Sequence, residues 1–243
     1  MIDVEELMDI HQGRETIYRF LSRSYRAEVD GEFLETLKTL LPHIEEMSFH
    51  SGNESLEKGG ALLGSFAHRL SHPPLGKEKG AELILELHRE FASLFLVGVH
   101  TIPCSESVYR SPERLIKQEP REKVVKRYRD IGFTVSPQWR EPEDHIAIEL
   151  EFMASVSRFA YEAADRGDPE GLRRSLNCQR EFMEEHLARW IPHFCTLLAA
   201  RAGDDSFYKA LSHLTDGFLE MDYEFLKASV PASGPKREEA QGD

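Results

Sequence analysis

The chain has 243 residues, 40% of them hydrophobic, which suffices for one large or two small domains with a sizeable core. It carries 30 basic and 43 acidic residues, a formal net charge of -13. Nucleic acids and anionic membranes are bound through Lys and Arg, so this charge argues against both targets and favours cationic partners. Three cysteines without a CxxC pair argue against a disulfide framework and favour reduced thiols in the cytoplasm.

Apolar residues recur at helical spacing through the first 95 residues. The first expected helix covers residues 4–25, and the second begins after Asp30 and stops near Pro42. Asn53 is expected to cap a third helix, which should end at His72-Pro73-Pro74. A fourth helix is expected to follow, with its apolar residues along one face as far as Phe95.

The middle of the chain contains two expected loops, residues 97–112 and 133–140, separated by a helix over 120–131. Gly132 is placed as the C-terminal stop of that helix. Long ordered loops in compact domains often carry function, so the longer one, 97–112, is a candidate part of a site.

The C-terminal half continues as helices. One runs from the Glu141 region to about Tyr161, and the next begins at Asp168-Pro169. Pro192 is expected to kink or restart that helix, and the last one spans about 205–227.

No stretch shows the sustained alternation typical of strands, so the sequence predicts an all-α fold. We expect a single helical domain of about nine or ten helices covering residues 1–228, followed by a disordered tail over 229–243. The acidic N-terminus lacks the pattern of a secretory signal, and no apolar stretch is long enough to span a membrane.

Gly59-Gly60 and Gly64-Ser65 have the glycine spacing of a phosphate-binding loop, but the lysine that such a loop requires is missing. We interpret these small residues as a place where two helices approach closely.

The densest group of polar residues lies where the helix of the Glu141 region begins. It comprises Glu141, Pro142, Glu143, Asp144, His145 and, one turn later, Glu149. Carboxylates are favoured near the positive end of a helix dipole, and Pro142 suits a first helical turn. An imidazole and several carboxylates at a helix mouth can bind a polar or cationic ligand; the simpler interpretation is an acid-capped helix start.

A metal site is not predicted. None of the eleven histidines has Glu three residues before it, which excludes the usual di-metal helical bundle. His145 and Glu149 alone supply only two ligands. A metal-dependent or oxygenase-like helical enzyme using these two residues is the alternative function, and a passive helical adaptor is a third. Cys104 has no strong activating group beside it and is expected to be idle.

Three segments together resemble one family. They are residues 141–153, residues 91–109 and residues 182–194. Their motifs resemble the TorD/DmsD family of cytoplasmic chaperones that mature molybdenum-containing oxidoreductases. The resemblance spans roughly Phe20 to Phe225 in order and spacing. It departs from the family pattern at Cys104-Ser105, where members often carry a further proline or aromatic residue.

The resemblance implies an all-helical protein without catalytic activity or cofactor. Such a protein binds the twin-arginine leader and the apo form of the catalytic subunit of a molybdopterin oxidoreductase. It protects that subunit until the cofactor is inserted and delays export until folding is complete. The client, nucleotide binding and the choice between a monomer and a domain-swapped homodimer stay open.

The family's leader-binding Asp-His pair maps to Asp144 and His145. Carboxylates accept the bidentate arginine fork, and an aromatic groove accepts the apolar part of a leader. The predicted leader-binding residues are Ser107, Tyr109, Trp139, Glu141, Pro142, Asp144, His145 and Glu149. Because Asp144 and His145 are hydrophilic residues at a helix start, alanine at either is expected to weaken leader binding with little loss of stability.

Overall fold

The computed structural model describes residues 4–71 and 77–230. Within these ranges the chain forms ten α-helical segments and two π-helical turns, with an isolated bridge between Ser105 and His145 as the only β pairing. One π turn continues α4 and the other joins α8 to α9, so the described chain forms nine continuous helices. The predicted all-α fold is confirmed.

The first half of the chain holds α1 (Val4–Arg26), α2 (Gly31–His50), α3 (Glu54–Ser71), α4 (Lys77–Phe91), η1 (Ala92–Leu96) and α5 (Glu106–Arg110). The second half holds α6 (Glu119–Asp130), α7 (Ile146–Asp165), α8 (Pro169–Phe182), η2 (Met183–Leu187), α9 (Ala188–Arg201) and α10 (Phe207–Ser229).

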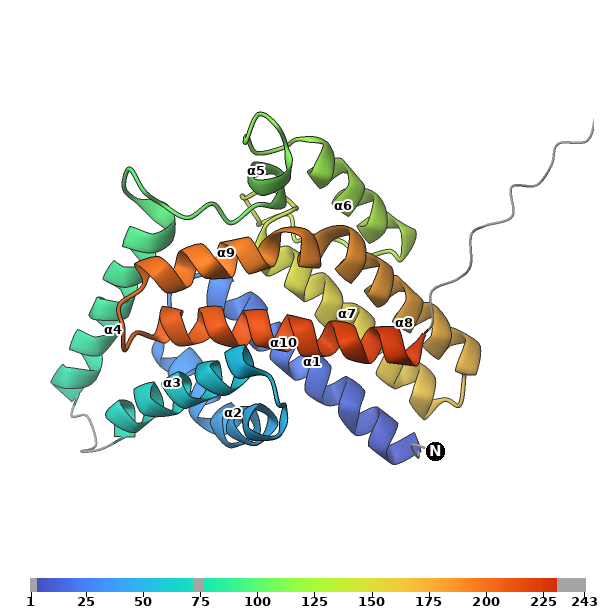
Figure 1. Ribbon diagram of the computed structural model, residues 1–243, viewed down its shortest axis with the longest axis horizontal. Coiled ribbons are helices and arrows are strands. Elements are labelled where there is room, and N and C mark those ends of the chain that lie inside the picture. The colour runs from blue at the N-terminus through green and yellow to red at the C-terminus, as the bar shows by residue number, and fades with distance from the viewer. Residues whose placement is uncertain (1–3, 72–76, 231–243) are drawn as a thin grey trace, which may run out of the picture.

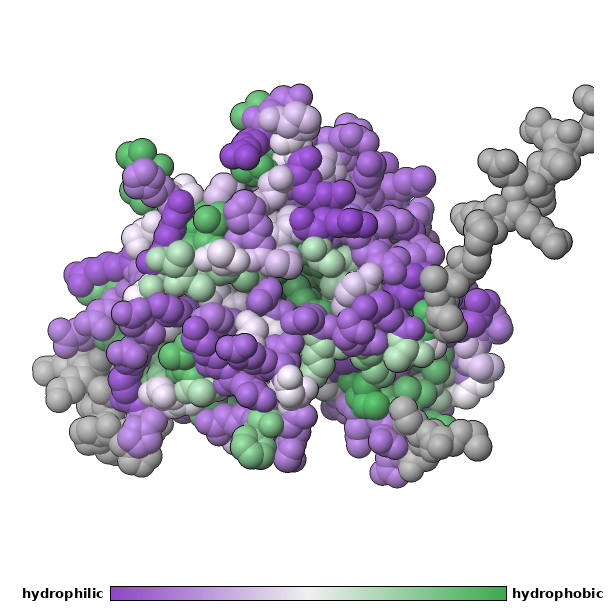
Figure 2. Space-filling model, viewed as in Figure 1, coloured by the Kyte–Doolittle hydropathy of each residue, from purple (hydrophilic) through white to green (hydrophobic). Residues whose placement is uncertain are grey.

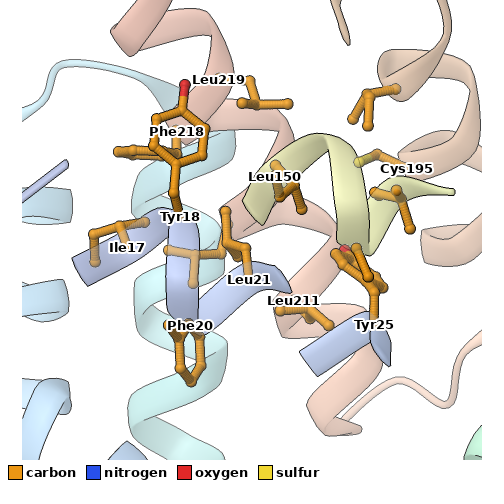
Figure 3. Packing of buried hydrophobic residues seen from close by; sticks show 14 of the residues in the cluster. Ile17, Tyr18, Phe20, Leu21, Tyr25, Leu150, Cys195, Leu211, Phe218 and Leu219 are labelled. Carbon is orange, nitrogen blue, oxygen red and sulfur yellow. The ribbon is translucent and has the colours of Figure 1, made fainter. Parts of the chain in front are cut away.

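Helix α10 crosses the molecule lengthwise and brings together helices that are distant in sequence (Figure 1). It packs closely on α3 and α9, while α1 packs along α7. Helix α4 lies at one end of the molecule, and α5 and α6 lie along one edge. The interior is a cluster of apolar side chains to which α1, α7, α9 and α10 contribute much, as Figure 3 shows for Tyr18, Leu21, Leu150, Cys195 and Phe218.

Several expected helix boundaries are confirmed by their hydrogen bonds. The Asn53 side chain accepts from Leu56 N at 2.9 Å, and that of Asp168 accepts from Gly171 N at 2.9 Å. Gly132 has a φ of +74°, the left-handed conformation that suits a helix stop. These polar and glycine signals are local, which is why the sequence alone located them.

The predicted close approach of two helices is also confirmed. A Cβ atom added to Gly59 in α3 would lie 2.5 Å from the backbone N of Leu214 in α10. Any larger residue at position 59 would therefore push the two helices apart.

Three predicted boundaries were wrong. Helix α2 continues through Pro42 because the apolar face on both sides of the proline, including Leu37 and Ile44, is buried in the core. Helix α7 begins at Ile146, so Pro142 lies in the turn before it. The expected loop over 97–112 contains the short helix α5.

Two expectations fall at the edge of the described chain. The helix break expected at residues 72–74 lies outside the described residues. Helix α10 continues through Ser229, and residues 231–243 also lie outside them, so the predicted tail and domain boundary stay predictions.

Candidate functional site

The start of α7 is fixed by His145, which is the N-cap of the helix. Its Nδ1 accepts a hydrogen bond from Ala147 N at 3.1 Å, so this ring nitrogen carries no proton. Burial, aided by the nearby Arg26 guanidinium, lowers the pKa of His145 to about 3. Ile146 N donates to Cys104 O at 2.8 Å, which ties the loop before α5 to the start of α7.

Asp144 joins α5 to the turn that precedes α7. Its Oδ2 accepts from Ser107 N at 2.8 Å and from Ser107 Oγ at 2.5 Å, and its backbone O accepts from Glu106 N at 2.9 Å. The Asp144 side chain is completely buried. Burial raises the pKa of Asp144, although the hydrogen bonds from Ser107 oppose this shift. Asp144 therefore holds the first turn of α5 against the start of α7.

A second buried carboxyl lies one turn further along α7. Glu149 Oε2 accepts from the indole Nε1 of Trp190 in α9 at 3.0 Å. Burial, followed by the proximity of the Glu106 carboxylate, raises the pKa of Glu149 well above its ordinary value. Glu149 consequently keeps its proton to a higher pH than an exposed glutamate would.

Glu106 connects this interior to a basic residue at the surface. Its carboxylate lies 2.9 Å from His186 Nδ1 and pairs with the guanidinium of Arg110. Arg110 also donates to Glu185 O at 2.6 Å. We call Glu106, Ser107, Asp144, Glu149 and His186 the buried polar network; it links α5, α7 and η2.

Two half-buried aromatic side chains, Tyr109 and Trp139, contact residues that neighbour this network. Tyr109 donates its hydroxyl to Pro103 O at 2.8 Å, and its ring centre lies 5.2 Å from that of Trp190. The ring centres of Trp139 and His145 lie 5.1 Å apart. The guanidinium of Arg26 lies 5.4 Å from the ring centre of Trp139.

The predicted site residues are brought together, but at different depths. Glu141 is exposed, and Tyr109 and Trp139 are half-buried. The other five are buried, namely Ser107, Pro142, Asp144, His145 and Glu149.

Burial revises what alanine is expected to do at Asp144. The expectation of little stability loss does not fit a carboxylate that accepts two hydrogen bonds in the interior, because both donors would lose their partner. Glu106, His186 and Trp190 were not assigned to the site from sequence. Their signal was available, since each is a polar or indole-bearing residue inside the segments 91–109 and 182–194.

Exposed apolar residues flank α5 on both sides. Leu96, Val97 and Val99 precede it, with 72% of Val97 and 94% of Val99 exposed, and Leu115 and Ile116 follow it. Figure 2 shows two projecting apolar tips separated by more polar surface. Each tip groups neighbouring exposed apolar side chains, as interaction sites on proteins often do.

The second of these apolar tips has an unusual backbone. Arg114 and Lys117 enclose it with φ values of +52° and +60°. Non-glycine residues adopt this left-handed conformation infrequently, and it concentrates at functional segments.

The side chains that would serve metal or thiol chemistry are engaged elsewhere. Within residues 4–71 and 77–230, no three His, Cys, Asp or Glu side chains are grouped so as to hold a metal ion. His145 and Glu149 are occupied as a helix cap and as the acceptor of Trp190. Burial and the nearby Glu141 carboxylate raise the pKa of Cys104 to about 12, so its thiol stays protonated at neutral pH. In the same ranges, no helix has the length and apolarity needed to cross a bilayer.

The fold and the site define an all-helical protein with an apolar core, a buried polar network and exposed apolar loops beside that network. Residues 53–196 match the family described as nitrate reductase delta subunit. The chain is 27% identical to the chaperone protein TorD of Aliivibrio salmonicida, over 92% of this chain and 99% of the relative. It is 26% identical to TorD of Vibrio parahaemolyticus, over the same shares of each chain.

A third relative, TorD of Photobacterium profundum, is 31% identical over 58% of this chain and 64% of its own length. The chain belongs to the nitrate reductase delta subunit and TorD chaperone family. Its members are maturation chaperones of redox enzymes and not enzymes, as the resemblance implied. The alternative of a metal-dependent or oxygenase-like enzyme was wrong.

Proposed function

We propose that this protein binds the twin-arginine leader and the apo form of the catalytic subunit of a molybdopterin oxidoreductase in the cytoplasm. It assists insertion of the cofactor and delays export of the client until the client has folded. The observation that carries this proposal is the exposure around α5 and the α7 start: Glu141 is exposed, Tyr109 and Trp139 are half-buried, and the loops on either side of α5 carry exposed apolar residues.

This surface offers carboxylates for the arginines of a twin-arginine leader and apolar side chains for its apolar part. Glu113 and Glu141 are exposed and have no ion pair within the described residues, so they are available to guanidinium groups. The apolar tip of Leu96, Val97 and Val99 suits the apolar part of the leader.

The faces of Tyr109 and Trp139 supply a third kind of contact. Trp139 already has the guanidinium of Arg26 over its ring, which is the arrangement expected for a bound arginine.

The buried residues of the predicted site act on the leader through these surface residues. Asp144 and Ser107 fix α5, and with it Tyr109. Pro142 O accepts from Trp139 Nε1 at 3.3 Å and orients that indole. His145 and Glu149 hold the start of α7.

The test is fluorescence anisotropy with a labelled synthetic leader that carries Arg-Arg, compared with the same peptide carrying Lys-Lys. Glu141→Ala should weaken binding by about 1.5–3 kcal/mol, the usual value of a hydrogen bond to a charged group. Asp9→Ala, which removes an exposed carboxylate on α1, is the matched control. Unchanged affinity of Glu141→Ala at unchanged melting temperature would refute this site.

Salt dependence separates the two halves of the interaction. Exposed charge pairs are screened over about 8 Å at physiological ionic strength, so affinity for the leader should fall as salt rises. The apolar contacts should persist, so binding should not vanish. We expect this binding without added metal or nucleotide; a requirement for either would contradict the proposal.

A further inference from the structure

A groove beside α4 has no role in the proposed function (Figure 1). It lies between α3, α4 and the start of α10, and its volume is about 670 Å³. Its floor is apolar, being formed by Phe66, Leu70, Leu83, Leu87 and Phe207. None of its lining residues belongs to the surface proposed to bind the leader.

The rim of this groove is strongly acidic. Glu82, Glu86 and Glu90 follow one another at four-residue spacing along α4, and Asp204 and Asp205 lie opposite. At four-residue spacing these side chains fall on one face of the helix, about 6 Å apart along its axis.

Two of these carboxylates are free to meet a ligand. Glu82 and Glu86 are exposed and form no ion pair within the described residues. Glu90 instead accepts from Gly203 N at 3.3 Å, and Asp204 pairs with Lys209 at 2.6 Å. The α4 side of the groove therefore carries two exposed carboxylates that pair with no described residue.

The groove already holds one guanidinium group of the protein itself. Arg69 lies over the ring of Phe66, 5.7 Å from its centre, and donates to the backbone O of Asp205. An aromatic ring and a nearby acidic residue therefore accommodate an arginine side chain in this groove. The α4 side of the groove offers carboxylates beside the leucine side chains of Leu83 and Leu87.

We infer that this groove docks a basic amphipathic helical segment of a partner protein, with two Arg or Lys side chains one helical turn apart. The two basic groups would pair with Glu82 and Glu86, and the apolar face would lie on Leu83 and Leu87. The charge complementarity carries this assignment, because an acidic rim would repel an acidic segment and would gain no charge pairing from a purely apolar one. This docking site goes beyond the proposed function and does not depend on it.

The experiment uses the full chain and a labelled 14-residue helical peptide with arginines four residues apart and leucines on the same face. A peptide with glutamates in place of the arginines is the peptide control. Glu82→Lys combined with Glu86→Lys should weaken binding of the arginine peptide about tenfold or more, since attraction becomes repulsion at two positions. The glutamate peptide should not bind the wild-type protein.

The matched control is Glu5→Lys combined with Asp9→Lys. Both residues are exposed on α1 at four-residue spacing, so the change in net charge and its pattern are the same. This variant should bind the arginine peptide within about twofold of wild type, because its charges lie away from the groove. Leu83→Ser, with its melting temperature measured, tests the apolar floor and should also weaken binding.

The outcomes separate this inference from the proposed function. Equal loss of affinity in the two charge-reversed variants would mean that only net charge matters, and the docking site would be wrong. Loss of peptide binding in Glu141→Ala but not in the Glu82 and Glu86 variant would place the peptide on the leader surface and also overturn the inference. If the leader fails to bind while the arginine peptide binds the groove, the proposed function alone fails.

Discussion

The junction of α5 with α7 and the groove between α3, α4 and α10 both concentrate carboxylates, but the junction encloses them and the groove exposes them. In the junction, Asp144 accepts from Ser107 and Glu106 pairs with Arg110 and His186, all within the chain. In the groove, Glu82 and Glu86 have no ion pair within residues 4–71 and 77–230. Carboxylates with internal partners hold the fold, whereas exposed ones without a partner among the described residues remain accessible to a ligand.

This difference matters because removing a carboxylate should reduce stability in one region and reduce binding in the other. Removing a buried partner leaves its donors unsatisfied and costs stability. Removing an exposed carboxylate changes the surface potential and costs binding. Parallel measurement of unfolding and of peptide affinity therefore tests the comparison directly.

The largest expected effect is at Glu106. Glu106→Ala should lower the free energy of unfolding by about 3–5 kcal/mol, because Arg110 and buried His186 lose their common carboxylate. Chemical denaturation monitored by circular dichroism measures this loss. A cost below about 1 kcal/mol would show that relief of the repulsion between Glu106 and Glu149 compensates for the lost pair. Glu106→Gln, which keeps the shape, should cost less.

Asp144→Ala should cost up to about 3 kcal/mol of unfolding free energy, because the N–H and hydroxyl of Ser107 lose their acceptor in the interior. Asp144→Asn retains an acceptor oxygen and should recover part of the loss. Thermal melts of both variants beside Glu141→Ala, which should melt like wild type, check the contrast. Equal melting temperatures for all three variants would mean that the burial of Asp144 does not make it more important for stability than exposed Glu141.

The pH dependence of the unfolding free energy should reveal that the fold keeps His145 neutral. Burial holds its pKa near 3 in the folded protein, so the unfolded chain, with an ordinary pKa of about 6.5, binds the proton more tightly. Stability contributed by neutral His145 is therefore present above pH 6.5 and lost as pH falls below it. Between pH 7 and pH 5 this loss should reach about 2 kcal/mol.

His145→Asn isolates that contribution. Asparagine is a favourable N-cap whose side-chain oxygen can accept from Ala147 N, and it does not titrate. The variant should lose about 2 kcal/mol less than wild type between pH 7 and pH 5, measured by urea denaturation at each pH. Parallel pH profiles would show that His145 is not held neutral by the fold.

The sequence predicted the fold because the signals for these helices are local. Apolar spacing, the Asn53 and Asp168 caps and Gly132 specify the helices without any knowledge of their neighbours. The errors arose where tertiary packing prevails over local preference. Pro42 stays inside α2 because Leu37 and Ile44 are buried on either side of it.

The site was predictable in composition but not in depth. The motifs assigned Ser107 and Asp144 to the same predicted site, and the structure places them in hydrogen-bond contact. Polar residue types gave no indication that Asp144 and Glu149 are completely buried, because burial depends on α5 and α9 covering them. The acidic groove was not predicted, since its two sides are about 120 residues apart in the chain.

The smallest expected effect lies in that groove. Like charges four residues apart on a helix destabilise it by about 0.2–0.5 kcal/mol, and Glu82 and Glu86 have this spacing on α4. Glu82→Gln combined with Glu86→Gln should therefore raise the free energy of unfolding slightly at low ionic strength, and the gain should disappear in high salt. Denaturation at both salt concentrations measures it. A loss of more than about 1 kcal/mol would mean that these carboxylates have structural partners, and the contrast between an enclosed and an exposed acidic region would fail. A small gain combined with weaker peptide binding would show that the groove retains its charges at some cost in stability, as expected for a surface that serves a partner.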